Sequence, residues 1–560
     1  MFQQSKELED NLRKERRKAE ERDAERRAMQ LGFPYLNLVS TKVPTELKAL
    51  ELVKEEDARR AMLVPLQIMR KKVVVASFNP STPDAEKIIS ELKKKYEVQI
   101  LVCSLTSLDH ALSYYQYISD AKDISGSIEI NEDNLRELQE KIKVMNDLSK
   151  EIASFKSPYT SQVLEIILAG ALAMNSSDAH LEPGEETNSF RLRIDGLLHT
   201  AYENFTSLVY RALITRIKLL SGLKLNIHNE AQDGRFTIKL KDRDIEVRTS
   251  VIPSEYGETV VLRLLDPLAL KTELTDLGWR HDDLEIVKKV VAEPNGLILN
   301  TGPTGSGKTT TLYAFLKNVT RSEIKIITIE DPIEYHLKGI SQTQVNVESG
   351  YTFASGLRSI LRQDPDIVLV GEVRDKETAE IALNAALTGH LVFSTLHTND
   401  AVGAIPRLLD LGAKPQTLGP ALSLVIAQRL VRTLCKECRQ EVPMNDSMEK
   451  DIREFIKGLP ERVDRKSYEE FGIWKAKGCP SCGGLGYRGR TSIFELFVVS
   501  QEIEGLIYNN PTEIDLKNAA RAQGMVWLQE DGMLKVLKGI TTIEEVERLT
   551  GKLEWIKNRT

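Results

Sequence analysis

The sequence predicts a multidomain α/β protein, and three observations lead to this fold class. A length of 560 residues suggests three or four domains, each able to bury a core of its own. Short apolar runs alternate with helical patterns along most of the chain, which is typical of sheets covered by helices. One apolar run, 297–299, leads into a glycine-rich loop and then into a helix, as in a parallel α/β core.

The glycine-rich loop at 302–309 fits the pattern G-x-x-x-x-G-K-[ST] in the strand–loop–helix context that this motif requires. Glycines let backbone N–H groups and a helix N-terminus face an anion. Lys308 would place a positive charge at the β/γ-phosphates, and the Thr309 hydroxyl would bind Mg²⁺. The expected nucleotide-binding residues are Gly302, Pro303, Thr304, Gly305, Ser306, Gly307, Lys308, Thr309 and Thr310. The chain is therefore predicted to bind a nucleoside triphosphate.

Composition narrows the class of protein. A net charge of −6 gives no general attraction to nucleic acid, and no apolar segment approaches the roughly 20 residues that span a bilayer. The N-terminus lacks the apolar centre of a signal peptide. Nucleotide chemistry and five cysteines, four of them in two C-x-x-C pairs, indicate the reducing cytoplasm.

A charged tail and a small α/β domain are expected first. Residues 1–30 carry nearly balanced charges, which favours a solvated helix or frayed tail over a membrane or partner contact. The first N-terminal domain is expected at 31–117. Its predicted elements are strands at 73–78 and 98–103 and helices at 84–95 and up to 117. Cys103, in an apolar strand, is expected to be a core thiol.

A linker at 118–158, leading into an amphipathic helix, is predicted to precede a second domain at 159–268. The second domain begins with a buried-helix pattern at 163–173, and strands are predicted at 189–194, 234–240 and 245–252. Arginines recur at its apparent edges: Arg193, Arg235, Arg248 and Arg263. Alone they would indicate a solvated sheet face, but beside a nucleotide site they become candidate phosphate contacts.

The nucleotide domain is predicted at 277–430, with polar residues at the ends of its strands. Its predicted strands are 324–329, 367–370 and 391–394, followed by acids or a histidine. Ligands of a parallel sheet lie beyond the carboxyl ends of its strands. Hydrolysis needs Mg²⁺ and a group that orients the attacking water. Of Asp331, Glu334 and Glu372, we assign Glu372 to Mg²⁺ through water and Glu334 to the base, although these two roles could be exchanged. His390 and His397 are candidate sensors of the γ-phosphate.

Two C-x-x-C pairs follow, and an insert is predicted at 431–492. Cys435, Cys438, Cys479 and Cys482 supply four thiolates suited to tetrahedral Zn²⁺, whereas free thiols or a redox pair are the alternatives. Four thiolates leave no open coordination position, so this Zn²⁺ would stabilise the fold. The long separation of the pairs predicts an insertion with its own helix. The remaining residues, 493–560, are predicted to be helical.

These motifs together resemble the secretion ATPase superfamily that drives type II secretion and type IV pilus assembly, over nearly the whole chain. The motifs are a Walker A loop at 302–309, an Asp box at 328–334, a Walker B segment at 361–372, a His box from 388–390 through 397–400, and N-terminal motifs at 177–183, 193–196 and 232–235. Retraction ATPases of this family generally lack both the first N-terminal domain and the four-cysteine insert. Their presence here suggests a pilus extension or secretion motor.

The resemblance implies a PAS-like α+β second domain beside a RecA-like P-loop ATPase core, with ATP, Mg²⁺ and Zn²⁺ as ligands. It implies a homohexamer that acts through an inner-membrane platform protein and a cytoplasmic assembly protein, at the inner face of the cytoplasmic membrane. The arginines that would neutralise transition-state charge are Arg235, Arg248, Arg263, Arg358 and Arg362. Longer relatives carry an N-terminal motif that binds cyclic di-GMP, which residues 1–30 do not resemble, so this ligand is doubtful.

Pilus extension is the function that the resemblance favours, with a type II secretion or DNA-uptake pseudopilus ATPase as the alternative. A nucleic-acid translocase and a nucleotide-switched scaffold without turnover are the competing classes. The acidic net charge and the lack of aromatic–basic stripes weigh against the first. Retention of Lys308, Glu334 and Glu372 weighs against the second.

Overall fold

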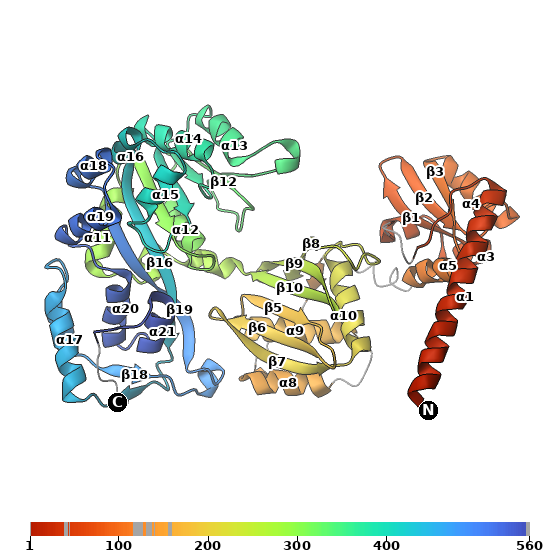
Figure 1. Cartoon of the computed structure of the whole chain (residues 1–560), viewed down its shortest axis with the longest axis horizontal. Coiled ribbons are helices and arrows are strands. Elements are labelled where there is room, and N and C mark those ends of the chain that lie inside the picture. The colour runs from red at the N-terminus through yellow and green to blue at the C-terminus, as the bar shows by residue number, and fades with distance from the viewer. Residues whose placement is uncertain are drawn as a thin grey trace. The chain divides into compact units, whose positions relative to one another are not determined.

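The computed structural model describes residues 2–38, 43, 45–115, 127–129, 137–138, 140–154 and 160–555. It divides the chain into two compact units, Met1–Leu265 and Asp266–Thr560. In Figure 1 the first unit runs from red to yellow-green and the second from green to blue. Among the described residues no helix combines the length and apolar character needed to cross a bilayer.

The N-terminal helix α1, Phe2–Leu31, packs on the first small domain through its C-terminal half. Ala24 and Ala28 are buried there. The Glu21 carboxylate accepts hydrogen bonds from Tyr35 Oη at 2.5 Å and from Ser104 Oγ at 2.7 Å. The helix prediction is confirmed, but this half of the helix is docked and not solvated all round.

The first domain is a three-stranded sheet with helices, as the sequence predicts. The strand order is β1-β2-β3, with β1 and β2 antiparallel and β2 and β3 parallel. Its elements are α2 Leu47–Leu50, α3 Glu55–Ala61, β1 Leu63–Met69, β2 Lys72–Ser77, α4 Pro83–Lys93, β3 Glu97–Val102 and α5 Leu105–Leu112. Cys103 is buried, and burial raises the pKa of its thiol to about 12, so the expected core thiol is confirmed.

The second domain is a seven-stranded sheet in the order β4-β8-β9-β10-β5-β6-β7. Its elements are β4 Ser127–Glu129, α8 Met145–Ser154, α9 Thr160–Ala173, β5 Asp178–Glu182, β6 Asn188–Ile194, β7 Leu197–Phe205, α10 Ser207–Leu220, β8 Gln232–Lys239, β9 Asp244–Ser254 and β10 Gly257–Leu265. Buried and exposed side chains alternate along the strands, with Phe236, Val247 and Leu262 in the core. The expected α+β fold is confirmed, while much of the predicted linker, 118–126, 130–136, 139 and 155–158, lies outside the described residues.

The second unit is built on a seven-stranded sheet in the order β13-β12-β14-β15-β11-β16-β19. Its strands are β11 Gly296–Thr301, β12 Ile326–Glu330, β13 Ser341–Gln344, β14 Ile367–Val370, β15 Leu391–Leu396, β16 Leu422–Leu434 and β19 Tyr487–Val498. All neighbouring strands are parallel except β16 and β19, which are antiparallel. This order confirms the predicted RecA-like core, because β15 separates the strand of the glycine-rich loop from β14.

Helices cover both faces of this sheet. Along β11, Leu297 and Leu299 pack into one apolar cluster and Ile298 into the other, as the two-residue period of a strand requires. The helices that contribute to one cluster are α11 His281–Val291 and α12 Lys308–Val319. Those that contribute to the other include α13 Phe353–Leu361, α14 Lys376–Leu387, α15 Ala404–Asp410 and α16 Pro415–Ala421.

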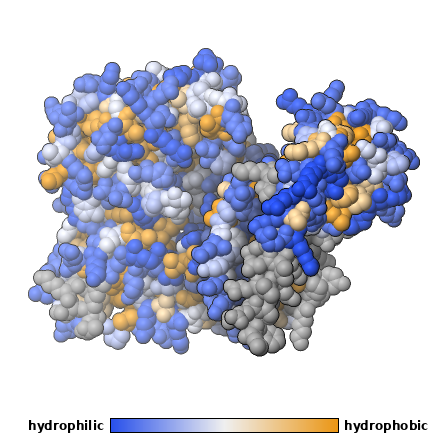
Figure 2. All heavy atoms as spheres, turned by 45° about the vertical axis from the view of Figure 1, so that its right-hand side comes forward, coloured by the Kyte–Doolittle hydropathy of each residue, from blue (hydrophilic) through white to orange (hydrophobic). Residues whose placement is uncertain are grey.

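The four-cysteine segment forms an insert between β16 and β19, and it carries the predicted helix. The insert contains β17 Gln440–Val442, α17 Asp446–Gly458 and β18 Ile473–Lys475. The C-terminal region is helical as predicted, with α18 Gln501–Tyr508, α19 Glu513–Ala522, α20 Leu528–Leu537 and α21 Ile543–Thr550. Figure 2 shows a mainly hydrophilic face with scattered hydrophobic side chains.

Candidate functional site

The glycine-rich loop between β11 and α12 has a backbone that only glycine tolerates at several points. Gly302, Gly305 and Gly307 have φ of +152°, +79° and +92°. A Cβ at Gly302 would lie 2.6 Å from the Gln428 carbonyl oxygen, and one at Gly307 would lie 2.9 Å from Gln428 Nε2. The loop therefore lies close against β16, and side chains larger than hydrogen are excluded there.

Polar groups in this loop fit an anionic ligand. Lys308 Nζ folds across the loop and donates to the carbonyl oxygens of Gly302, at 2.7 Å, and Pro303, at 3.2 Å. The buried Ser306 Oγ has no hydrogen-bond partner among the described residues. Burial lowers the pKa of Lys308 to about 8, with Glu372 opposing the shift and Arg429 adding to it. A phosphate at this loop would give both side chains a charged partner.

Glu372 and His397 lie beside this lysine at the carboxyl ends of β14 and β15. The Glu372 carboxylate forms an ion pair with Arg374, and its other oxygen lies 3.5 Å from His397 Nε2. Burial, and then the charge of Lys308, lower the pKa of His397, which favours the neutral ring. The structure thus brings Lys308, Glu372 and His397 together, as expected for strand ends at one edge of a parallel sheet.

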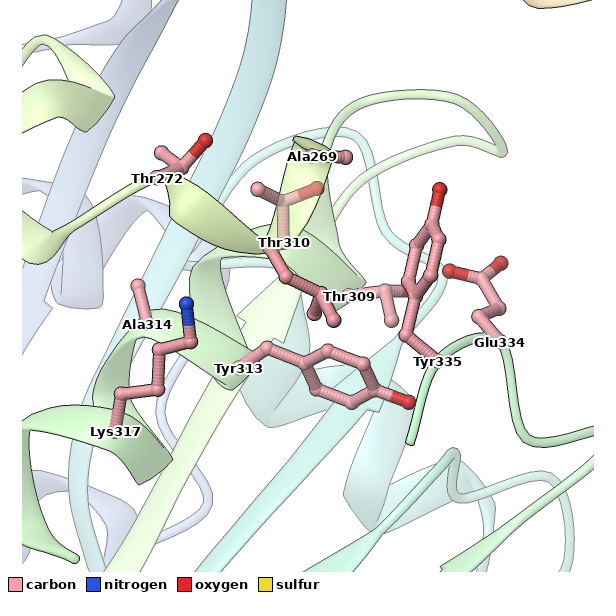
Figure 3. Close-up of a pocket in the computed structure, with 10 residues that line it drawn as sticks. Ala269, Thr272, Thr309, Thr310, Tyr313, Ala314, Lys317, Glu334 and Tyr335 are labelled. Carbon is pink, nitrogen blue, oxygen red and sulfur yellow. The ribbon is translucent and has the colours of Figure 1, made fainter. Parts of the chain in front are cut away.

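Glu334 lies beside α12, the helix that begins at Lys308. A cavity beside the N-terminal half of α12 is lined by Ala269, Leu270, Thr272, Thr309, Thr310, Tyr313, Ala314, Lys317, Glu334 and Tyr335. Thr309, Tyr313 and Lys317 are four residues apart along α12 and so share one helix face. Figure 3 shows Glu334 and Tyr335 across this cavity from the α12 side chains. Asp331 is exposed at the start of the same loop.

The three candidate arginines of the first unit form a row across its sheet. Arg235 on β8 is the direct cross-strand neighbour of Arg248 on β9, which in turn pairs with Arg263 on β10. Because directly opposite residues point to the same face, the three side chains share one face. The row continues to Asp178, whose carboxylate accepts from Arg263 Nε at 2.9 Å and lies 3.6 Å from Arg193 Nε. Arg235 and Arg263 are exposed and Arg248 is half-buried.

Three further predicted site residues are Arg358, Arg362 and His390. Arg358 and Arg362 are exposed at the end of α13, where Arg358 forms an ion pair with Glu377. His390 precedes β15, and its carbonyl accepts from Gly296 N at the first residue of β11. The phosphate loop follows the other end of β11, some six residues or roughly 20 Å along the sheet. The structure therefore places His390 at the opposite end of β11 from the phosphate loop, away from the expected γ-phosphate position.

Arg429, a buried arginine beneath the loop, was not predicted as a site residue. On β16, its Nη1 donates to Gln428 O at 2.9 Å and its Nη2 to Asn399 O at 2.7 Å. The Arg429 side chain therefore connects β16, which packs against the phosphate loop, to the segment that carries His397. Burial lowers the pKa of Arg429. Nothing in the apolar pattern of β16 distinguishes this arginine from a solvated one, so its place could be found only from the pairing of β16 with β11.

The four cysteines of the insert converge as expected for a metal site. Their Sγ atoms all lie within 4.8 Å of one another. The Sγ–Sγ separations are 3.8 Å for Cys435–Cys479, 3.9 Å for Cys438–Cys482 and 3.7 Å for Cys479–Cys482. A tetrahedron with Zn–S bonds of about 2.3 Å has edges of about 3.8 Å, whereas a disulfide needs about 2.05 Å. The cluster therefore fits a tetrahedral ion.

Backbone donors favour the thiolate at one of the four cysteines, Cys482, whereas burial raises the pKa values of Cys435 and Cys438. The amides of Cys479 and Gly486 both donate to Cys482 Sγ at 3.2 Å. Although burial acts in the opposite direction, these backbone hydrogen bonds lower the pKa of Cys482 to about 7. A thiolate that forms readily near neutral pH is the ligand that Zn²⁺ requires.

Comparison with known proteins identifies two family models in the chain. Residues 155–548 match the model described as type II/IV secretion system protein, and residues 31–122 match the MshEN domain. The first match covers most of the chain, including both the arginine row and the phosphate loop.

Individual relatives agree with this match. Type II secretion system protein E of Pseudomonas aeruginosa is 43% identical and covers 77% of this chain and 82% of its own length. Type II secretion system ATPase E of Vibrio cholerae is 40% identical, over 81% of this chain and 88% of that protein. Type IV pilus assembly ATPase PilB of Thermus thermophilus is 37% identical over 96% of this chain, which spans 58% of that relative's length. The chain therefore belongs to the type II/IV secretion system protein family, as an ATP-hydrolysing secretion ATPase.

Proposed function

We propose that this protein is the motor ATPase of a type IV pilus assembly machine, coupling ATP hydrolysis to pilin extension through a membrane platform protein. The convergence of Lys308, Glu372 and His397 at one edge of the sheet, with Glu334 across α12, carries the hydrolytic part of the proposal. The similarity to the pilus assembly ATPase extends over 96% of the chain, which favours pilus extension.

The second candidate function is the ATPase of a type II secretion machine. The relatives named for type II secretion have higher identity, 40% and 43%, although they cover less of this chain. A DNA-uptake pseudopilus would use the same chemistry. In all three cases the protein would act as a homohexamer with a platform protein and a cytoplasmic assembly protein, at the inner face of the cytoplasmic membrane.

Within the site, Lys308 and the backbone N–H groups of the loop would hold the β- and γ-phosphates. Thr309 and Glu372 would hold Mg²⁺, Glu372 through water, and bound Mg²⁺ would neutralise charge on the phosphate oxygens. Glu334 lines the cavity beside Thr309 at the start of α12. This position supports Glu334 as the base that takes the proton of the attacking water. Asp331 would help to orient the same loop.

The arginine row would act by closure of the two units. A loose phosphoryl transition state spreads negative charge over three oxygens, and arginine donates two hydrogen bonds while staying protonated. Moving Arg235, Arg248 and Arg263 to the triphosphate would join each hydrolysis to a rigid-body movement, from the same chain or from a neighbour. Arg358 and Arg362 are further candidates of the same kind.

Two experiments test this function. Purified protein should hydrolyse ATP at the same rate with and without single-stranded DNA, whereas stimulation by DNA would indicate a translocase.

Deleting the gene in its source organism should remove surface pili seen by electron microscopy while leaving the secreted proteins unchanged. Loss of secreted proteins with intact pili would favour the type II secretion candidate.

Lys308 should make ATP binding depend on pH. Since burial lowers its pKa to about 8 and phosphate favours the charged amine, ATP affinity should fall above pH 8, by at most about tenfold per pH unit. Calorimetric titration with a non-hydrolysable ATP analogue between pH 7 and 9.5 measures this dependence. Lys308→Ala should bind weakly at every pH and show no turnover. Equal affinity of the unaltered protein at pH 7 and 9.5 would contradict the role.

Glu334→Gln should separate binding from hydrolysis. The amide keeps the shape of the side chain but cannot take a proton, so turnover should slow by at least about a hundredfold while ATP affinity is retained. Single-turnover hydrolysis measures the slow rate. Wild-type turnover in this variant would transfer the base assignment to Glu372.

The four-cysteine cluster should carry one Zn²⁺ per chain by elemental analysis. Cys479→Ser should lower both the metal content and the melting temperature, because the free energy of metal binding is also folding free energy. Cys103→Ser, which alters the cysteine outside the cluster, is the control for metal content. Purified protein that lacks metal yet melts at the same temperature as a zinc-loaded sample would argue against the site.

Arg248→Ala should slow turnover by about a thousandfold, the low end for an arginine finger, with nearly unchanged ATP affinity. Arg235→Ala and Arg263→Ala test the remaining members of the row. Arg243→Ala is the matched control, because Arg243 pairs with Asp242 in the turn between β8 and β9 and is not a member of the row. If all three row variants turn over normally, the row is ordinary surface charge.

A further inference from the structure

A buried carboxylate, Glu330, ends β12 immediately before the loop that carries Glu334. Only 4% of its surface is exposed. Oε2 accepts from Tyr313 Oη at 2.5 Å, and Oε1 accepts from Thr328 Oγ1 at 2.6 Å and from Gln342 Nε2 at 3.0 Å. All three donors are neutral, so the carboxylate is held by short hydrogen bonds to neutral groups. A buried charge held in this way needs each donor in place.

One of these donors comes from the phosphate-loop helix. Tyr313 lies one turn after Thr309 on α12, and both side chains line the cavity that Glu334 also lines. Burial, and then the charge of Glu330, raise the pKa of the Tyr313 phenol, so its hydroxyl remains a donor. In Figure 3 the Tyr313 ring extends from α12 toward the segment that bears Glu334 and Tyr335. The tyrosine therefore joins the helix after the phosphate loop to the end of β12.

Gln342, on β13, fixes the other end of the loop. Its Nε2 donates to Tyr335 O at 3.0 Å as well as to Glu330, and its Oε1 accepts from Leu337 N at 2.7 Å. Glu334 thus lies in a short segment that is held before it, at Glu330, and after it, at Tyr335 and Leu337. The proposed base therefore lies between a hydrogen-bonded side chain, Glu330, and a hydrogen-bonded stretch of backbone at Tyr335 and Leu337.

We propose that Tyr313, Glu330 and Gln342 are positioning residues that hold the Glu334 carboxylate over the phosphate loop. This inference rests on the proposed role of Glu334 as the base. A base must lie within hydrogen-bond reach of the water that it deprotonates, and small displacements of a catalytic group slow reactions strongly. The tie to α12 makes the position of the base follow the helix whose N-terminus faces the phosphates.

Tyr313→Phe tests the proposal in the full chain, because it removes one hydroxyl and leaves Thr328 and Gln342 on Glu330. We expect kcat to fall about tenfold, the scale of one hydrogen bond to a charged group, with KM for ATP within about twofold. Tyr351→Phe is the matched control. The Tyr351 hydroxyl accepts a hydrogen bond at 3.0 Å from Thr343 Oγ1 on β13, the strand that also carries Gln342. The control should keep kcat, and both variants should melt at similar temperatures. Gln342→Met, which removes the hydrogen bonds at the far end of the loop, should lower kcat in the same way.

Combination with Glu334→Gln separates positioning from other effects. If Tyr313 acts through Glu334, adding Tyr313→Phe to Glu334→Gln should not slow single-turnover hydrolysis further. A loss that multiplies in the double variant, an unchanged kcat in Tyr313→Phe, or an equal loss in Tyr351→Phe would each overturn the proposal. Wild-type turnover in Glu334→Gln alone is instead the failure of the proposed base.

Discussion

The parallel register of β11, β12, β14 and β15 is the constraint on which the site depends. Each of these strands ends at the same edge of the sheet, so residues far apart in the sequence meet there. Lys308 follows β11, Glu372 follows β14 and His397 follows β15. With β15 between β14 and β11, Glu372 still comes close enough to Lys308 to oppose the lowering of its pKa. A register shift of one residue in any of these strands would turn its buried side chains to the opposite face.

The β16–β19 hairpin connects this edge to the cysteine cluster. Along β16, Gln428 and Arg429 form the floor against which Gly302 and Gly307 are packed. Cys435 follows β16 directly, and Tyr487 begins β19 just after the second cysteine pair. Zinc held there would fix both ends of the insert at the tip of the hairpin. The ion would therefore stabilise the strand beneath the phosphate loop without taking part in hydrolysis.

The sequence predicted the parts of this fold that local patterns determine. Apolar runs at 367–370 and 391–394, the motif at 302–309 and the C-x-x-C spacing each depend on neighbouring residues, and the corresponding elements are confirmed. Arg429 and Glu330 were missed because both are charged residues inside strands, where a local pattern cannot tell a buried, hydrogen-bonded group from a solvated one. His390 was misplaced for a related reason. Its distance from the loop is set by which end of β15 it occupies, not by its nearness to His397 in the sequence.

The proposed hydrolysis uses side chains from both units of the chain. Within the second unit, Gln342 donates a hydrogen bond to the carbonyl oxygen of Tyr335, next to Glu334, and Arg374 forms an ion pair with Glu372. The arginine row belongs to the first unit, on one face of a sheet whose opposite face is a packed core. A site complete within one unit could hydrolyse ATP without moving. In the proposed function the first unit supplies the arginines that neutralise charge, so hydrolysis would depend on the movement of that unit, and a motor needs this dependence of chemistry on movement.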